Sequence, residues 1–191
     1  MSLIVNVFAG PGTGKSTLAA GVYTELKLAG INAEMAREYV KSWAWEGRQI
    51  GPFDQIYFMG KQARTETMLY RKASVIITDC PLLLGVVYAE RYSDPRIAKA
   101  VEDMAMAVYR VAEDSGHRYF NIMLSREKKY VQDGRYESED QAREVDRLAL
   151  AKLVQHNLPY LWGTSDSAGI ADISSMIINE TWADNVVYGT K

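Results

Sequence analysis

Short apolar runs alternate along this chain with longer segments in which apolar residues recur every three or four positions. The short runs are typical of buried strands and span residues 3–8, 32–36, 75–78, 119–124 and 159–162. The longer segments predict helices over 15–28, 54–70, 82–92, 94–113, 139–154 and 171–179. Strands that alternate with helices indicate βαβ units, so we expect an α/β fold around a parallel sheet.

Polar residues follow the end of each predicted strand. In parallel α/β sheets, ligands bind at the carboxyl ends of the strands, near a switch point in strand order. The polar residues found there are Arg37 and Glu38 after the second strand, Asp79 after the third, Ser125 and Arg126 after the fourth, and Thr164 and Ser165 after the fifth. These positions are therefore the first candidates for functional residues.

The segment after the first strand matches the phosphate-binding pattern G-x-x-x-x-G-K-[ST], except that Ala9 stands at its first position. Glycines let the backbone aim successive N–H groups at one anion, and the following helix points its positive dipole end at the same place. Lys15 then reaches the β- and γ-phosphates, and the Ser16 hydroxyl completes a Mg²⁺ shell. The expected nucleotide contacts are Gly10, Pro11, Gly12, Thr13, Gly14, Lys15, Ser16, Thr17 and Thr164.

Asp79 closes the hydrophobic strand that contains Val75 to Thr78. A carboxylate at this point resembles the second magnesium-associated motif of phosphate-loop enzymes, and it could hold Mg²⁺ or accept a substrate proton. The alternative is an N-cap of the next helix, because Pro81 lies just inside that helical run. Both readings leave the carboxylate near the phosphates.

Arg37 and Glu38 lie where a phosphoryl acceptor should enter. A hydroxyl acceptor benefits from a carboxylate that takes its proton, whereas a phosphate acceptor needs arginines that screen its charge. Both residue types are present, so the sequence leaves the acceptor open between these two classes. A surface ion pair at the end of a strand is the structural alternative.

One face of the predicted helix 54–70 carries Gln55, Met59 and Gln62, at spacings of four and three residues. The glutamine amides could read the edge of a heterocycle, with an aromatic ring packed nearby. In the alternative, the glutamines are solvated and Ile56, Phe58, Met59 and Ala63 form a plain core stripe.

A polar, basic and glycine-containing segment spans 125–137 and precedes a helix. We interpret it as a lid whose cations stabilise the transferring phosphoryl group and exclude water. Arg126 and Arg135 are the expected catalytic cations, because arginine grips phosphate in a bidentate way and lysine does not. A solvated basic loop is the alternative.

Composition narrows the classes of function. The 191 residues fit one domain, and the net charge of −2 provides no global attraction to nucleic acid or to an anionic membrane. Cys80 is the only cysteine, so neither a disulfide nor a zinc site is expected, and a cytoplasmic monomer or homodimer fits best.

Trp43 and Trp45, placed in a loop with Lys41 and Arg48, could stack a base, but packing on a helix surface is the simpler interpretation.

Three further stretches, Ala36-Arg37-Glu38-Tyr39-Val40, Gln132-Asp133-Gly134-Arg135 and Asn157-Leu158-Pro159-Tyr160, accompany the phosphate loop. With them, the chain resembles P-loop nucleoside and nucleotide kinases, and more narrowly the ribosylnicotinamide kinase domain of bacterial NAD-regulator proteins and related small phage and bacterial ATPases. The resemblance implies a three-layer αβα sandwich with a five-stranded parallel sheet in the order 2-3-1-4-5. It also implies Mg·ATP as donor, and an acceptor bound between the end of the second strand and the lid.

The expected activity is therefore ATP-dependent transfer of the γ-phosphoryl group to a small nucleoside-like acceptor. Lys15, Asp79, Glu38, Arg126 and Arg135 are the expected catalytic residues, with Ser16 and Asp79 at Mg²⁺ and Arg37, Glu38, Gln55 and Gln62 at the acceptor. A ribosylnicotinamide-type nucleoside is the first acceptor to consider, followed by a deoxynucleoside or a nucleoside monophosphate. The alternatives are an ATP-hydrolysing switch that acts on a macromolecular partner, and a polynucleotide 5′-kinase.

Overall fold

Five parallel strands form the centre of the computed structural model, which describes residues 1–127, 129–131 and 136–188, with side chains as far as residue 181. The strands are β1 (Leu3–Phe8), β2 (Ala33–Ala36), β3 (Val75–Thr78), β4 (Arg118–Leu124) and β5 (Tyr160–Gly163). Their order in the sheet is β2-β3-β1-β4-β5, and every neighbouring pair is parallel. The expected α/β fold and strand order are both confirmed.

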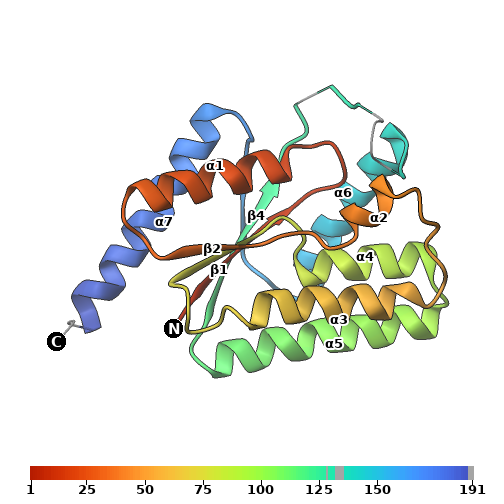
Figure 1. Ribbon diagram of the computed structural model, residues 1–191, viewed down its shortest axis with the longest axis horizontal. Coiled ribbons are helices and arrows are strands. Elements are labelled where there is room, and N and C mark those ends of the chain that lie inside the picture. The colour runs from red at the N-terminus through yellow and green to blue at the C-terminus, as the bar shows by residue number, and fades with distance from the viewer. Residues whose placement is uncertain (128, 132–135, 189–191) are drawn as a thin grey trace.

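Helices cover both faces of this sheet (Figure 1). They are α1 (Lys15–Leu28), α2 (Lys41–Trp45), α3 (Asp54–Thr67), α4 (Leu82–Tyr92), α5 (Pro95–Asp114), α6 (Glu139–Gln155) and α7 (Ser167–Tyr188). Helices α1 and α7 pack together on one face, whereas α3, α4, α5 and α6 contact one another on the opposite face. The result is a three-layer αβα sandwich. None of the helices described is long and apolar enough to cross a membrane.

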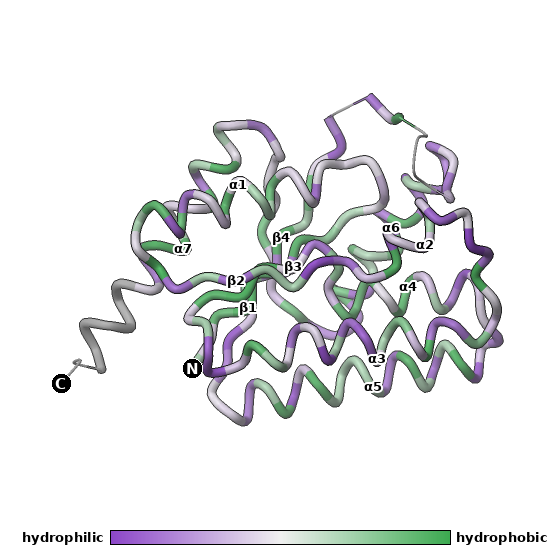
Figure 2. The backbone as a smooth tube through the Cα atoms, viewed as in Figure 1, coloured by the Kyte–Doolittle hydropathy of each residue, from purple (hydrophilic) through white to green (hydrophobic). Residues whose placement is uncertain are grey.

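Two buried clusters hold the layers together, one on each face of the sheet. On the first face, Val5 and Val7 of β1 pack with Leu18 of α1 and Ile173 of α7. On the other face, the apolar sides of α4, α5 and α6 meet Phe8 and Met123. Figure 2 shows the same division, since hydrophobic and hydrophilic positions alternate along α3 and α5, while β1 is hydrophobic except at Asn6. Strands buried on both faces are typical of a parallel sheet.

Helix α1 begins and ends where its sequence signals predict. Gly14 precedes it with a φ of 108°, in the left-handed region that glycine adopts without strain. At its other end, Gly30 has a φ of 76°, and the N–H groups of Gly30 and Ile31 donate to Lys27 and Leu26. These bonds satisfy carbonyls at the end of the helix.

The structure corrects three sequence-based expectations. Trp43 and Trp45 lie on the short helix α2 and not in a loop, because five residues are too few to show a helical period. Helix α3 ends at Thr67, before the predicted residue 70. Helix α7 extends beyond the predicted 171–179 in both directions.

Candidate active site

The loop between β1 and α1 has the backbone conformation of an anion cradle. Gly12 and Gly14 both have positive φ, at 77° and 108°, so the chain turns tightly before the first turn of α1. The Thr13 hydroxyl and the Lys15 ammonium group each donate to the carbonyl oxygen of Gly10, at 3.0 Å. The lysine is thereby folded over its own loop, at the N-terminus of a helix where phosphate groups bind.

Asp79 connects this loop to the end of β2. The Ser16 hydroxyl donates to Asp79 Oδ2 at 2.6 Å, and the backbone N–H of Glu38 donates to Asp79 Oδ1 at 3.2 Å. Asp79 is buried, and Pro81, not Asp79, is the N-cap residue of α4. The structure therefore places this carboxylate beside the phosphate loop and rules out the capping alternative.

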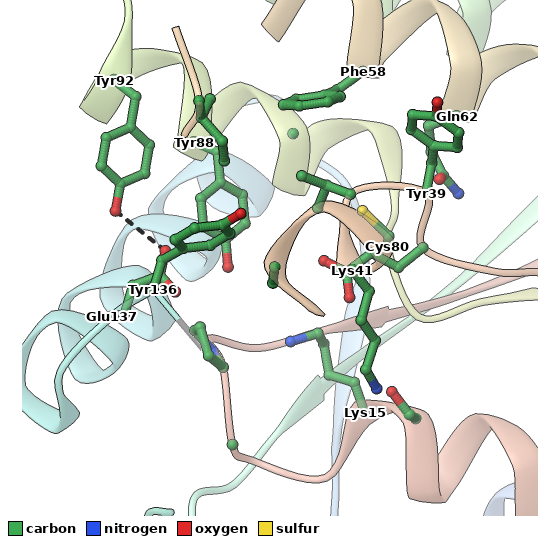
Figure 3. Close-up of a pocket in the computed structure, with 18 of the residues that line it drawn as sticks. Lys15, Tyr39, Lys41, Phe58, Gln62, Cys80, Tyr88, Tyr92, Tyr136 and Glu137 are labelled. Atoms are coloured by element: carbon green, nitrogen blue, oxygen red, sulfur yellow. Dashed lines mark hydrogen bonds between the residues drawn. The ribbon is translucent and has the colours of Figure 1, made fainter. Parts of the chain in front are cut away.

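A cavity of about 980 Å³ opens from the phosphate loop toward α2, α3 and α4 (Figure 3). Its floor includes Lys15 and Ser16, and Lys41 of α2 points into the same space. Aromatic side chains form much of its wall, namely Tyr39, Trp45, Phe58, Tyr88, Tyr92 and Tyr136. Loop and aromatic wall thus border one continuous space.

Among the residues that the structure describes, two acidic groups line this cavity, with different surroundings. Burial raises the pKa of Glu38 above its ordinary value of 4.5, and the nearby Asp79 adds to this effect, whereas the Lys15 ammonium group opposes it. Glu137 is buried and accepts a hydrogen bond from the Tyr92 hydroxyl at 3.2 Å. Burial also raises the pKa of Cys80 well above its ordinary value, so its sulfur stays a protonated and weakly nucleophilic thiol.

The structure brings Gln55, Met59 and Gln62 together on the cavity side of α3, as their spacing predicts. Both glutamines are buried, and the Gln62 amide donates to the Thr78 hydroxyl at 3.3 Å. Phe58 and Ala63 are buried as well, but Ile56 is 48% exposed. The glutamines are therefore part of the cavity wall, and the simple stripe that included Ile56 is wrong.

Other expected site residues lie apart from the cavity. Arg37 is exposed and is absent from the described cavity lining. The Thr164 hydroxyl donates to Asp166, at 2.8 Å, also outside that lining. Arg126 forms an ion pair with Asp146 at 2.7 Å instead of facing the cavity. Arg135 lies outside the described residues, as do several positions of the expected lid 125–137.

Sequence reasoning missed several residues of the cavity wall. Tyr88 and Tyr92 have the i, i+4 spacing of one helix face, a signal that could have placed both on the cavity side of α4. The sequence placed Lys41 only near Trp43 and Trp45 and did not predict that it lines the cavity. Trp43 packs against two residues of the cavity wall. Its ring centroid lies 4.8 Å from that of Phe58 and 5.1 Å from the Arg48 guanidinium carbon.

Residues 5–166 match a family model described as an AAA domain. The chain belongs to this AAA domain family. Among solved structures, this AAA domain is similar to a NadR protein in complex with NR, with a TM-score of 0.70 and 16% identity over 91% of this chain and 51% of that chain. It is also similar to a NadR protein in complex with NAD and AMP-PNP, with a TM-score of 0.63 and 15% identity over 87% of this chain and 45% of that one.

These likenesses show a P-loop fold shared with NadR. The chain spans about half the length of the NadR chains that it matches. No curated protein matches its sequence. The solved structures thus show the fold of this chain and not its activity.

Proposed function

We propose that this protein is an ATP-dependent kinase that transfers the γ-phosphoryl group to a small nucleoside-like acceptor. The observation that carries the proposal is the single cavity that joins the phosphate loop to a wall of aromatic rings, glutamines and carboxylates. An ATPase that only hydrolyses ATP binds no acceptor and therefore does not require such a wall beside its phosphates. A kinase needs it to place the acceptor in line with the γ-phosphate.

The donor side is formed by the loop and the start of α1. Backbone N–H groups of the loop and the Lys15 ammonium group would hold the phosphates of ATP, with the lysine leaving the Gly10 carbonyl for a phosphate oxygen. Thr164 and Arg135 remain predicted contacts of the nucleotide and of the transferring group.

Ser16 and Asp79 are suited to hold Mg²⁺. A hydroxyl and a carboxylate that already meet at 2.6 Å supply the hard oxygen ligands that this ion prefers. Among the described residues, no group of three or more His, Cys, Asp or Glu could hold a metal by itself. Oxygens of a bound nucleotide and water would therefore complete the shell. When bound, the ion neutralises charge on the phosphates.

The acceptor side is formed by β2, α2, α3 and α4. A nucleoside ring would stack against aromatic side chains such as Tyr39 and Tyr88, while the Gln55 and Gln62 amides bind its polar edge. Its hydroxyl oxygen would attack the γ-phosphorus as the bond to the β–γ bridging oxygen of ATP breaks. The hydroxyl proton passes to the Glu38 carboxylate, and ADP leaves.

The two carboxyl groups of the cavity wall favour an uncharged or cationic nucleoside as the first acceptor. Glu38 and Glu137 place carboxyl groups among tyrosine rings, a setting that suits hydroxyl groups and cationic rings. Ribosylnicotinamide meets this description, and the similar NadR protein was solved in complex with NR. Lys41, Arg48 and Lys129 also line the cavity, so a nucleoside monophosphate is the second acceptor to test.

A phosphotransfer screen tests the proposal. The protein is incubated with Mg²⁺ and ATP labelled at the γ-phosphate, together with ribosylnicotinamide, deoxynucleosides, nucleoside monophosphates or a 5′-hydroxyl oligonucleotide. Label in one of the small acceptors supports the kinase. Hydrolysis that depends only on a macromolecular partner favours the ATP-driven switch, and label in the oligonucleotide alone favours a polynucleotide 5′-kinase.

A further inference from the structure

The phosphate loop is attached to the first turns of α6 by one part-buried ion pair. The Arg126 guanidinium donates through Nε to Asp146 Oδ2 at 2.7 Å, and its side chain is only 6% exposed. Asp146 Oδ1 in turn accepts the backbone N–H of Gly10, at 2.5 Å. A second guanidinium nitrogen of Arg126 donates to the carbonyl oxygen of Pro11, at 2.9 Å. The pair therefore holds both a donor and an acceptor of the loop backbone.

Gly10 packs closely against α6 and Arg126. A Cβ atom at Gly10 would lie 2.1 Å from the carbonyl oxygen of Ala142 and 3.1 Å from Arg126. The same guanidinium group also donates to that Ala142 oxygen, at 3.4 Å. The start of the loop is thus in direct contact with the backbone of α6, and Arg126 fills the junction.

These bonds also decide which parts of the loop remain free for a phosphate. The N–H of Gly10 is directed to Asp146, and Pro11 has no N–H. The donors for a phosphate therefore begin at Gly12. Because the first two residues are held by side chains, the donors from Gly12 onward are aimed before any nucleotide binds, which lowers the entropy cost of binding.

The geometry points to Arg126 and Asp146 as a positioning pair that pre-orders the phosphate loop for ATP. The inference rests on the proposed use of this loop for ATP, and it does not depend on which acceptor is phosphorylated. It assigns Arg126 a role apart from the lid cation expected from the sequence. Arg126 acts through the loop backbone, and Asp146 is an equal partner in that action.

The direction in which nucleotide affinity changes when Asp146 is replaced separates a positioning role from simple electrostatics. Asp146 is an acidic residue bonded to the loop that would bind phosphates, so removal of its charge alone should strengthen the binding of a polyanion. A positioning role predicts the opposite, because Asp146→Ala leaves the Gly10 N–H and the Arg126 guanidinium without their partner. Asp146→Asn keeps one oxygen acceptor and should have an intermediate effect.

The test measures the affinity of AMP-PNP with Mg²⁺ by calorimetry and the hydrogen exchange of a peptide that covers the loop in the ligand-free protein. We expect Asp146→Ala and Arg126→Met each to weaken nucleotide binding about tenfold or more. Loop exchange should become faster, and KM for the acceptor should not change. Glu139→Gln serves as the matched control, because it breaks an exposed ion pair with Arg143 on the same helix. It should change neither the nucleotide affinity nor the hydrogen exchange of the loop.

Arg126→Lys adds a graded check, since a lysine can keep the charge but cannot bond Asp146, Pro11 and Ala142 together. It should fall between the wild type and Arg126→Met in both measurements. Tighter or unchanged nucleotide binding in Asp146→Ala, with unchanged loop exchange, would overturn the inference. A fall in kcat in Arg126→Met with nucleotide affinity and loop exchange intact would also overturn it, in favour of a transition-state cation.

Discussion

The Ser16 hydroxyl donates a hydrogen bond of 2.6 Å to the Asp79 carboxylate, although the two residues are 63 positions apart in the chain. The other oxygen of that carboxylate accepts the backbone N–H of Glu38. One buried carboxylate therefore contacts the phosphate loop on one side and the acceptor wall on the other. Any change at Asp79 should affect both halves of the proposed reaction.

The first prediction concerns Asp79→Asn. The amide oxygen can still accept from Ser16 or Glu38, so the variant should fold, but it lacks the negative charge that a Mg²⁺ ion needs. We expect turnover to fall by roughly 10²-fold or more, with a higher Mg²⁺ requirement. Steady-state kinetics across a Mg²⁺ titration measure both. Asp103→Asn on the exposed side of α5 is the control, and an unaltered Mg²⁺ dependence in Asp79→Asn would argue against the metal site.

Lys15→Ala should abolish turnover while the fold persists. In the ligand-free protein the Lys15 ammonium group bonds only the Gly10 carbonyl among the described contacts, so its loss should change the unfolding temperature little. Without it, the β- and γ-phosphates lose the lysine cation that would balance their charge beside the loop. Thermal melting and phosphotransfer rates are compared with those of Lys99→Ala, a surface change on α5. Full activity in Lys15→Ala would contradict the mechanism.

The contiguous parts of the fold and site were predictable from the sequence, and the parts that depend on distant contacts were not. Residues 3 to 28 carry a complete local signal, in which an apolar strand, a glycine loop and a helix follow in order. Asp79 was also predictable, because it ends an apolar strand. The bond between Arg126 and Asp146 was not, since the two residues lie 20 positions apart and no sequence pattern pairs them. Tyr136 and Glu137 reach the cavity for the same tertiary reason.

The pH dependence of turnover should report on Glu38. Burial raises the pKa of its carboxyl, so a larger share is protonated near neutral pH than for an exposed glutamate. If its carboxylate accepts the hydroxyl proton, turnover rises with pH as Glu38 loses its proton and levels off above its pKa. Glu38→Gln should lose this rising limb together with roughly 10²-fold or more of the rate. An unchanged pH profile in the glutamine variant would assign the proton to another group.

Gln62 should act on the acceptor and not on ATP. It is buried in the cavity wall, and its amide is held by Thr78. Gln62→Leu keeps the approximate size but removes the polar edge that would bind the acceptor, so the acceptor KM should rise about tenfold. The KM for ATP should stay the same. Gln155→Leu, at the exposed end of α6, is the control, and equal changes in both KM values would point to a general structural effect.

Stability should depend on pH through Glu66, which lies on α3 outside the cavity lining. Burial raises the pKa of Glu66 to about 7, although a hydrogen bond from Tyr70 partly opposes the shift. The pKa of Glu66 in the folded protein exceeds its ordinary value of 4.5, so the protonated carboxyl favours the folded state. This contribution to folding stability is fully present below about pH 4.5 and is lost as the pH rises through about 7. At higher pH the wild type should be less stable than Glu66→Gln, by on the order of 3 kcal/mol at most.

Denaturant unfolding of the wild type and Glu66→Gln at about pH 5 and about pH 9 measures this difference. The gap between the two proteins should widen in favour of the glutamine variant as the pH rises. Parallel pH dependences would show that Glu66 keeps an ordinary pKa in the folded protein.

The most direct measurement of the central claim is the fate of the γ-phosphate. The protein is incubated with Mg²⁺, ATP labelled at the γ-phosphate and each small acceptor in turn, and the labelled products are separated and identified. The kinase account predicts label in a nucleoside-like acceptor, in an amount that matches the ADP formed, and no such product from Lys15→Ala. Release of all the label as inorganic phosphate, at a rate that no small acceptor changes, would contradict it.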